Sequence, residues 1–199
     1  MGKVFAEIDD RLVRWIRGQQ MFFVATAPAI GGRINLSPKG PVESLQVLDP
    51  HTIAYLDLIG SGAETIAHLR QNGRICVMLC AFQGPPRILR MHGRGAVLAP
   101  GSDRFDRTAE AFDLTAMPAA EHAARSIIMV EVERIADSCG YDVPLMVEQG
   151  RRPQRGAWVD NKLSKGGQAA LAEYVAEHNA ESIDGLPALP LGAGRQQQA

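Results

Sequence analysis

Short strand-like runs separated by turn residues fill the first third of the chain, and this spacing limits the folds that are open to it. Hydrophobic and β-branched residues gather at 21–27, 33–37, 44–48 and 52–58. Pro, Gly and Asp-Pro breakers separate these runs, and such residues end strands and form turns. Closely spaced strands favour an antiparallel sheet or barrel over a parallel sheet whose strands alternate with helices.

The rest of the chain adds longer strands and a few helices. Strand-like runs at 74–82 and 87–98 flank Gln83-Gly84-Pro85-Pro86, which is typical of a hairpin, and a further run covers 126–135. Apolar spacing predicts helices over 7–19, over 102–125 with a break at Pro118, and over 162–178. Another helix begins after Gly62 and ends at Asn72-Gly73, because Gly adopts the left-handed cap conformation.

These elements predict a fold that is mainly β with peripheral helices, an α+β class. We expect residues 1–185 to form a single domain, since a chain of 199 residues falls within the usual size of one domain. The tail at 186–199 carries Pro, Gly and Gln in place of an apolar pattern, so we expect it to be poorly ordered.

Composition excludes several classes of protein. The net charge is −1 without a basic stripe, which argues against nucleic-acid binding. The longest apolar run, 75–82, is far shorter than the roughly 20 residues that span a membrane, and the charged N-terminus lacks the apolar core of a signal peptide. Three cysteines fit no disulfide framework, and Cys76 and Cys80 lack the paired spacing of a zinc site. We therefore expect a cytoplasmic protein that binds no metal.

Gly60-Ser61-Gly62 lies between the strand at 52–58 and the helix that follows, as in many phosphate-binding turns. A dinucleotide fingerprint would need Gly where this chain has Thr65. Residues 61–64 also match a capping box, in which Ser61 and Glu64 satisfy the first amides of the helix without any ligand. The carboxylate of Glu64 would repel a phosphate, which weakens the ligand-binding interpretation without excluding it. Both the ligand-binding and the capping interpretations therefore stay open.

Two strands present polar side chains at alternate positions. In RINLSPKG, the residues Arg33, Asn35, Ser37 and Lys39 would share one face of a strand. In RILRMHGRG, Arg90 and His92 would share a face as well. Such a face suits an anionic ligand, although a strand with one solvated face produces the same alternation.

Taken in order, RINLSPKG, YLDLIGSGAET, HLRQNGRICVML and PPRILRMHGRG resemble the pyridoxamine 5′-phosphate oxidase-related family of FMN-binding split barrels. The resemblance implies a six-stranded antiparallel split β-barrel. It also implies a homodimer with one FMN in each of two clefts at the dimer interface. Carried onto this chain, the resemblance assigns these residues to cofactor binding: Arg33, Asn35, Ser37, Lys39, Ser61, Gly62, Thr65 and Arg90.

The chain departs from the pyridoxal-phosphate-making enzymes at two places. Ala63-Glu64-Thr65 stands where those enzymes place Ser-Arg-Lys, so Lys39 and Arg90 are expected to supply the charges for the phosphate. The C-terminal region also lacks their Arg-x-His substrate motif, which argues against pyridoxamine phosphate oxidation itself.

Two function classes remain open. The first is an FMN-dependent oxidoreductase that acts on an unidentified small molecule, with a nicotinamide as one candidate electron donor. The second is a non-catalytic flavin- or haem-binding carrier or sensor. No pattern of nucleophile and base stands out in the sequence, as expected where a flavin carries the chemistry and the protein binds and orients it.

Overall fold

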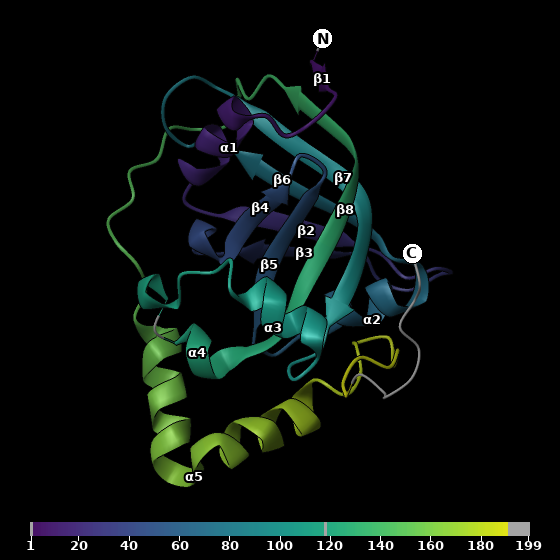
Figure 1. The fold of residues 1–199 in the computed structure, drawn as a ribbon, viewed down its shortest axis with the longest axis vertical. Helices are drawn as coiled ribbons and strands as arrows, with labels where there is room; N and C mark the ends of the chain where they lie inside the picture. Colours follow the sequence, from purple (N-terminus) through teal and green to yellow (C-terminus); the bar gives the residue numbers. More distant parts are fainter. Residues whose placement is uncertain (1, 118, 191–199) are drawn as a thin grey trace.

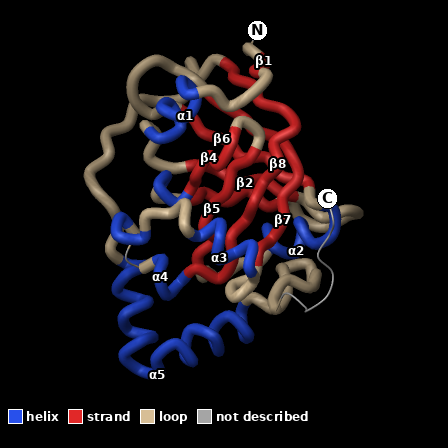
Figure 2. Tube along the Cα trace, in the orientation of Figure 1, coloured by secondary structure: helices blue, strands red, loops and turns tan. Residues whose placement is uncertain are grey.

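An eight-stranded sheet forms the centre of the computed structural model, which describes residues 2–117 and 119–190 (Figures 1 and 2). All neighbouring strands pair antiparallel, in the order β3-β2-β6-β7-β8-β5-β4, and β1 adds to β8. The strands are β1 (Val4–Phe5), β2 (Phe22–Thr26), β3 (Asn35–Lys39), β4 (Leu45–Asp49), β5 (Thr52–Leu58), β6 (Arg74–Cys80), β7 (Ile88–Leu98) and β8 (Ala124–Ser138). Because β3 and β4 end the order without pairing, the barrel stays open. The expected split-barrel class is confirmed.

The strand count differs from the six that the family resemblance implies. Val4 and Phe5 form a short strand of their own because β8 continues to Ser138, three residues past its expected end, and offers them a free edge. A register shift at His92/Gly93 interrupts the long pairing between β7 and β8. Bulges of this kind bend long strands and help a sheet to curve.

Five helices surround the sheet, and α1 and α5 lie at opposite ends of it in Figure 1. They are α1 (Asp10–Arg17), α2 (Glu64–Asn72), α3 (Asp103–Ala109), α4 (Ala120–Ala123) and α5 (Gln154–His178), with short 3-10 turns at Val42–Ser44 and Leu114–Ala116. None of the helices in the described ranges is long and apolar enough to cross a membrane. Gly166 and Gly167 break the helical conformation within α5 and kink it.

The helical stretch expected over 102–125 with a break at Pro118 is less helical than expected, because α3 and α4 form only its two ends and a 3-10 turn at Leu114–Ala116 lies between them. Asp113 accepts a hydrogen bond from the backbone N–H of Thr115, a local turn that competes with helix formation. The next strand then begins at Ala124. The predicted break at Pro118 lies outside the described residues.

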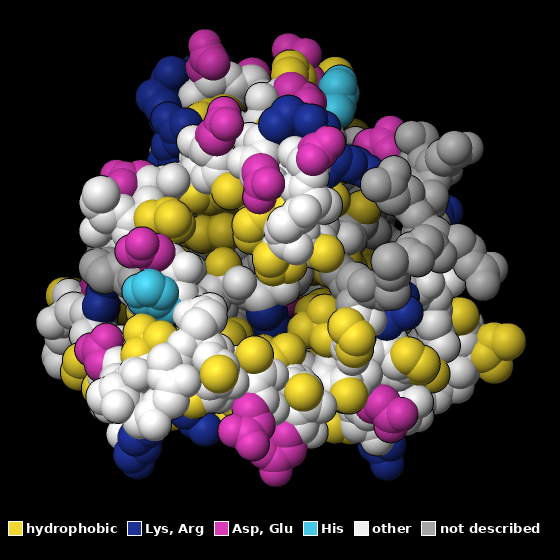
Figure 3. Space-filling view, turned by 60° about the horizontal axis from the view of Figure 1, so that its bottom comes forward, with side chains coloured by type: hydrophobic (Ala, Val, Ile, Leu, Met, Phe, Trp, Pro, Cys, Tyr) yellow, Lys and Arg dark blue, Asp and Glu magenta, His cyan; other side chains and the backbone are white. Residues whose placement is uncertain are grey.

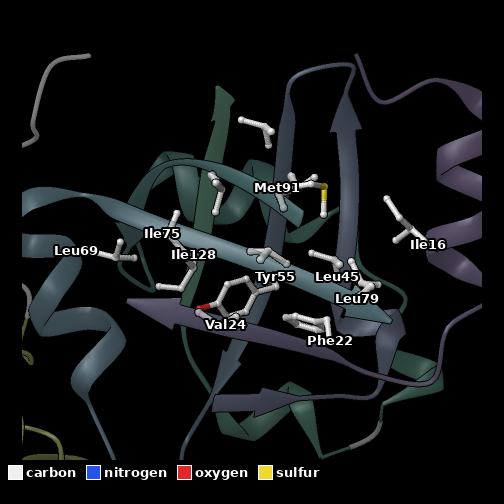
Figure 4. Packing of buried hydrophobic residues seen from close by; sticks show 14 of the residues in the cluster. Ile16, Phe22, Val24, Leu45, Tyr55, Leu69, Ile75, Leu79, Met91 and Ile128 are labelled. Atoms are coloured by element: carbon white, nitrogen blue, oxygen red, sulfur yellow. The ribbon is translucent and has the colours of Figure 1, made fainter. Parts of the chain in front are cut away.

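The interior of the barrel is filled from all sides by aliphatic and aromatic side chains. Figure 4 shows Tyr55 among Phe22, Val24 and Ile128, and the rings of Phe22 and Tyr55 meet edge-on with centroids 5.4 Å apart. Helix α1 closes one end of this core with Leu12, and Asp9 caps the helix by accepting from the Leu12 N–H at 2.8 Å. The barrel interior is therefore the largest of three hydrophobic clusters, and the two smaller ones lie around α3 and α4 and around α5.

The C-terminal segment folds back against the body of the protein. The Ala188 side chain is fully buried, and its carbonyl oxygen accepts from Arg70 of α2 at 2.6 Å. Ser182 N–H donates to the carbonyl of Leu186, which closes a turn. Residues 186–190, which the sequence analysis assigns to the tail, are thus packed in place, and 191–199 lie outside the described residues.

Gly93 on β7 lies directly against the backbone of β8. A Cβ atom added there would lie 1.9 Å from the carbonyl oxygen of Glu131, so the strands would have to separate. We expect Gly93→Ala to lower the free energy of unfolding by about 2 kcal/mol or more, measured by urea denaturation. Gly156→Ala is the matched control, since nothing lies near its added Cβ in α5 and it should raise stability by about 0.5 kcal/mol. Equal stability of the two variants would contradict this account of the sheet.

Candidate functional site

A cavity of about 330 Å³ opens at the end of the sheet where β3, β5 and the start of α2 meet. Its walls combine polar and charged side chains with glycine backbone. The lining residues are Ser37, Pro38, Lys39, Gly40, Ser44, Leu56, Leu58, Gly60, Ser61, Gly62, Glu64, Thr65, Arg125 and Arg155. In the space-filling view of the α5 end, basic side chains lie in a hollow between hydrophobic ones (Figure 3).

Asp57 is the buried anchor of this cavity. Its fully buried carboxylate accepts from Lys39 Nζ at 3.0 Å and from Arg125 Nε at 2.9 Å. Burial by itself raises the pKa of Asp57, but the two cations outweigh burial and hold that pKa below its usual value of 3.8. Asp57 therefore stays ionised and fixes two cationic side chains on the cavity wall.

Three side chains hold the carbonyl groups of the loop before α2. Arg155 donates to the Ile59 carbonyl, Asn179 Nδ2 to that of Gly60 at 2.9 Å, and Arg125 Nη2 to that of Gly62 at 2.7 Å. Within the part of the chain that the structure describes, the N–H groups of Gly60, Ser61 and Gly62 donate to no protein acceptor. The loop thus offers free amides beside a helix N-terminus, an arrangement that favours anions.

The capping-box interpretation is wrong. Helix α2 begins at Glu64 with Ala63 as its N-cap, and no side chain caps it. A helix capped by Ser61 would need Ala63 in the helical conformation, but Ala63 has φ −127° and ψ 14°. The Glu64 carboxylate instead lies against Gly62 and accepts from the Ile183 N–H at 3.3 Å. Ser61 is left to line the cavity.

Behind the cavity, a chain of polar side chains links β3 to α2. The Asn35 amide nitrogen donates to the hydroxyls of Thr26 at 3.1 Å and Thr65 at 3.0 Å, and Ser37 donates to the Asn35 oxygen at 2.8 Å. Thr26 in turn contacts Nδ1 of His68 at 3.0 Å. The alternation expected for Asn35, Ser37 and Lys39 is thus present, and it begins where β3 begins.

The structure does not bring all the sequence-predicted residues together. Ser37, Lys39, Ser61, Gly62 and Thr65 line the cavity, and Asn35 supports them from behind.

Arg33 precedes β3 and pairs with Asp184 at 2.5 Å on the surface. Arg90 lies on β7, where it donates to Ser138 Oγ at 3.0 Å, and it does not line the cavity of its own chain. A role for Arg33 and Arg90 in cofactor binding stays a prediction.

Sequence reasoning missed three charged residues of the site: Asp57, Arg125 and Arg155. A signal for Asp57 was present, because an acidic residue inside the hydrophobic run TIAYLDL needs a buried partner. Arg125 and Arg155 come from distant parts of the chain and carried no local pattern. Burial lowers the pKa of Arg155 below its usual value.

Removing the charge of Asp57 should leave Lys39 and Arg125 repelling each other around an uncharged amide. We expect Asp57→Asn to lower the free energy of unfolding by about 3–5 kcal/mol in thermal or urea denaturation at pH 7. A carboxylate with a lowered folded-state pKa stabilises above its unfolded pKa of about 3.9, and this contribution disappears as pH falls below it. The difference in the free energy of unfolding between the parent protein and Asp57→Asn should therefore become smaller at acid pH.

Asp184→Asn is the control for this substitution, because its partner Arg33 is largely exposed and surface pairs contribute little. If Asp184→Asn lowers the free energy of unfolding as much as Asp57→Asn does, then burial of the ion pair does not explain the loss of stability.

Comparison with known proteins identifies relatives of this chain in sequence and in fold. A family model described as Pyridoxamine 5′-phosphate oxidase matches residues 8–139. The chain is similar to the pyridoxamine 5′-phosphate oxidase family protein ustO of Aspergillus flavus, with 36% identity over 198 residues that cover 93% of this chain and 77% of that protein.

Among solved structures, HupZ of Group A Streptococcus aligns with a TM-score of 0.52 and 20% identity, covering 66% of this chain and 99% of HupZ. That likeness shows a shared fold. The family match spans most of the chain, including strands β2 to β8, the loop at 59–62 and α2. The chain therefore belongs to the pyridoxamine 5′-phosphate oxidase family.

Proposed function

We propose that this protein binds FMN with the phosphate in the cavity beside α2, and that it acts as an FMN-dependent oxidoreductase on a small molecule. The observation that carries the proposal is the loop at 59–62: side chains bond the carbonyls of Ile59, Gly60 and Gly62, while the N–H groups of Gly60, Ser61 and Gly62 have no protein acceptor in the described chain. A phosphate monoester carries nearly two negative charges and accepts several hydrogen bonds, so it suits such a loop.

The charges around the cavity fit the same group. Lys39, Arg125 and Arg155 line it, and Asp57 offsets only part of their positive charge. The Arg125 atom Nη1 is buried and has no hydrogen-bond partner in the described chain, so it is available to an anionic oxygen. These three cations also offset Glu64, the one carboxylate that lines the cavity.

A bound flavin would supply the hydride chemistry. The residues of the chain would hold the phosphate and fix the orientation of the cofactor, since Lys39 and Arg125 are tied to Asp57. Because the C-terminal region lacks the Arg-x-His substrate motif of the pyridoxal-phosphate-making enzymes, we propose a substrate other than pyridoxamine phosphate. Stopped-flow reduction of the bound flavin by a nicotinamide donor tests whether the protein is an enzyme. If the flavin stays oxidised with every donor and substrate tried, the protein is a carrier.

A homodimer is part of the proposal. Leu36 on β3 and Ile34 just before it are large apolar residues that are 65% and 80% exposed. They stand at the end of the sheet order, where a second copy could cover them. Exposed apolar surface of this kind is typical of protein–protein contacts.

The phosphate assignment predicts that Arg155→Ala and Lys39→Ala weaken FMN binding by about ten- to a hundredfold. Each substitution removes one charge-assisted hydrogen bond, worth about 1.5–3 kcal/mol. The affinity for riboflavin, which lacks the phosphate, should change little in either variant. Binding of both ligands can be followed by the visible spectrum and flavin fluorescence. Arg94→Ala is the control, because Arg94 pairs with Glu133 on the surface away from the cavity. Unchanged FMN affinity in both cavity variants would refute the assignment.

The dimer proposal predicts that Leu36→Glu shifts the protein towards the monomer. A carboxylate at this position would have to be desolvated against the apolar surface of the second copy. Light scattering coupled to size exclusion measures the mass, with a dimer expected for the parent at micromolar concentration. A monomeric parent that still binds FMN would contradict the proposal.

A further inference from the structure

A second cavity, of about 560 Å³, lies beside α1. It is bounded by α1, by the loop between β6 and β7, and by the end of β8 with the residues that follow it. Among the described residues, this α1 cavity shares no lining residue with the cavity beside α2. Helix α1 also stands at the opposite end of the sheet from α5, whose Arg155 lines the first cavity (Figure 1). The α1 cavity is therefore separate from the proposed flavin site.

Arg87 is a firmly held cation on the wall of the α1 cavity. Its Nε and Nη2 atoms donate to Asp137 Oδ2 at 3.1 and 2.9 Å. Its guanidinium carbon lies 5.2 Å from the ring centre of Trp15 and 5.4 Å from that of Phe5, distances at which an aromatic ring attracts a cation. Its Nη1 atom donates to no acceptor in the described chain. The planar guanidinium thus has a fixed orientation and keeps donors for a ligand.

The cavity keeps an excess of positive charge. Both oxygens of Asp137 are occupied, because Oδ2 accepts from Arg87 and Oδ1 accepts from the Lys3 N–H at 2.7 Å. Burial raises the pKa of Asp137, but the Lys3 amide and Arg87 outweigh burial and hold that pKa below its usual value. Arg14, the second lining cation, is exposed on α1 and donates from its side chain to no described residue. Two arginines and one carboxylate leave a net charge of +1 on the lining.

Aromatic and proline side chains form the other walls of the α1 cavity. Trp15 is half-buried beside Arg87, and Pro85 and Pro86 line the cavity from the loop between β6 and β7. The Tyr141 side chain is 80% exposed, so its ring has little packing within its own chain and is free to stack on a flat ligand. Cavities of about 300–1,000 Å³ with mostly apolar walls and a few fixed polar groups are typical of small-molecule sites.

We propose that the α1 cavity is a second binding site, which takes an aromatic carboxylate. The carboxylate would bind Arg87 and Arg14, and the ring would lie against Trp15 and Tyr141. A carboxylate carries a single negative charge, which matches the net charge of the lining, and its two oxygens match the fork of a guanidinium. A phosphate monoester carries nearly two negative charges, which this lining would only half balance. The site goes beyond the proposed function, since it requires no flavin.

The fluorescence of Trp15 gives a direct measure of binding. The chain has two tryptophans, and Trp158→Phe removes the other one, which lies in α5. In this variant we expect benzoate to change the Trp15 emission saturably. Benzamide, which has the same ring without the charge, should bind at least about tenfold more weakly. No saturable change with benzoate, or equal affinity for benzoate and benzamide, would overturn the proposal.

Substitutions at exposed positions test the two walls without disturbing the core. Arg14→Ala should weaken benzoate binding about three- to tenfold. Arg17→Ala is the matched control, because Arg17 is exposed one turn further along α1 and does not line the cavity. Tyr141→Phe keeps the ring and should bind as the parent does, whereas Tyr141→Ala should bind about threefold more weakly. Equal affinity in Arg14→Ala and Arg17→Ala would contradict the assignment of the carboxylate.

Repeating the benzoate titration with FMN present separates this site from the flavin cavity. We expect the affinity for benzoate to be the same with and without FMN, because the two cavities share no lining residue. Competition between the two ligands would place benzoate in the flavin cavity and would overturn the proposal. If the protein does not bind FMN, the proposed function fails, and the benzoate titration still decides on the α1 cavity.

Discussion

A buried carboxylate, that of Asp57, is the constraint on which the site depends. An ionised group inside a hydrophobic strand is costly unless it is paired and hydrogen-bonded. The pairing brings Lys39 from β3 and Arg125 from the start of β8 to the same end of the sheet. Arg125 also donates to the Gly62 carbonyl. The buried charge of Asp57 therefore positions two cations of the cavity and, through Arg125, the loop beside it.

The cavity is completed by a part of the chain that the family match does not cover. Arg155 and Asn179 lie beyond residue 139, where the match ends, and both donate to carbonyls of the loop before α2. Helix α5 and the segment that follows it therefore do more than cover the barrel. They hold the loop in an arrangement that leaves the N–H groups of Gly60, Ser61 and Gly62 without a protein acceptor in the described chain. We propose that this arrangement lets a chain without the Arg-Lys pair of the pyridoxal-phosphate-making enzymes bind a phosphate.

The sequence predicted the features that depend on local pattern. Strand spacing indicated the antiparallel sheet, and alternation placed Asn35, Ser37 and Lys39 on one face. Where prediction failed, contacts between distant residues decided the outcome. The capping box at Ser61 is absent, since Ala63 is not helical and α2 begins at Glu64, and the Gly62 carbonyl is instead bonded by Arg125, 63 residues away. Arg155 acts on Ile59 across 96 residues, a distance over which periodicity carries no information.

The central claim is that the loop amides and the cations tied to Asp57 form the phosphate site. A crystal structure of the protein with FMN bound tests this most directly. The account predicts phosphate oxygens within hydrogen-bond distance of the N–H groups of Gly60, Ser61 or Gly62 and of the Arg125 guanidinium, with the Lys39 to Asp57 pair intact. A phosphate held elsewhere on the chain, with this loop and Arg125 left without contact to it, would contradict the account.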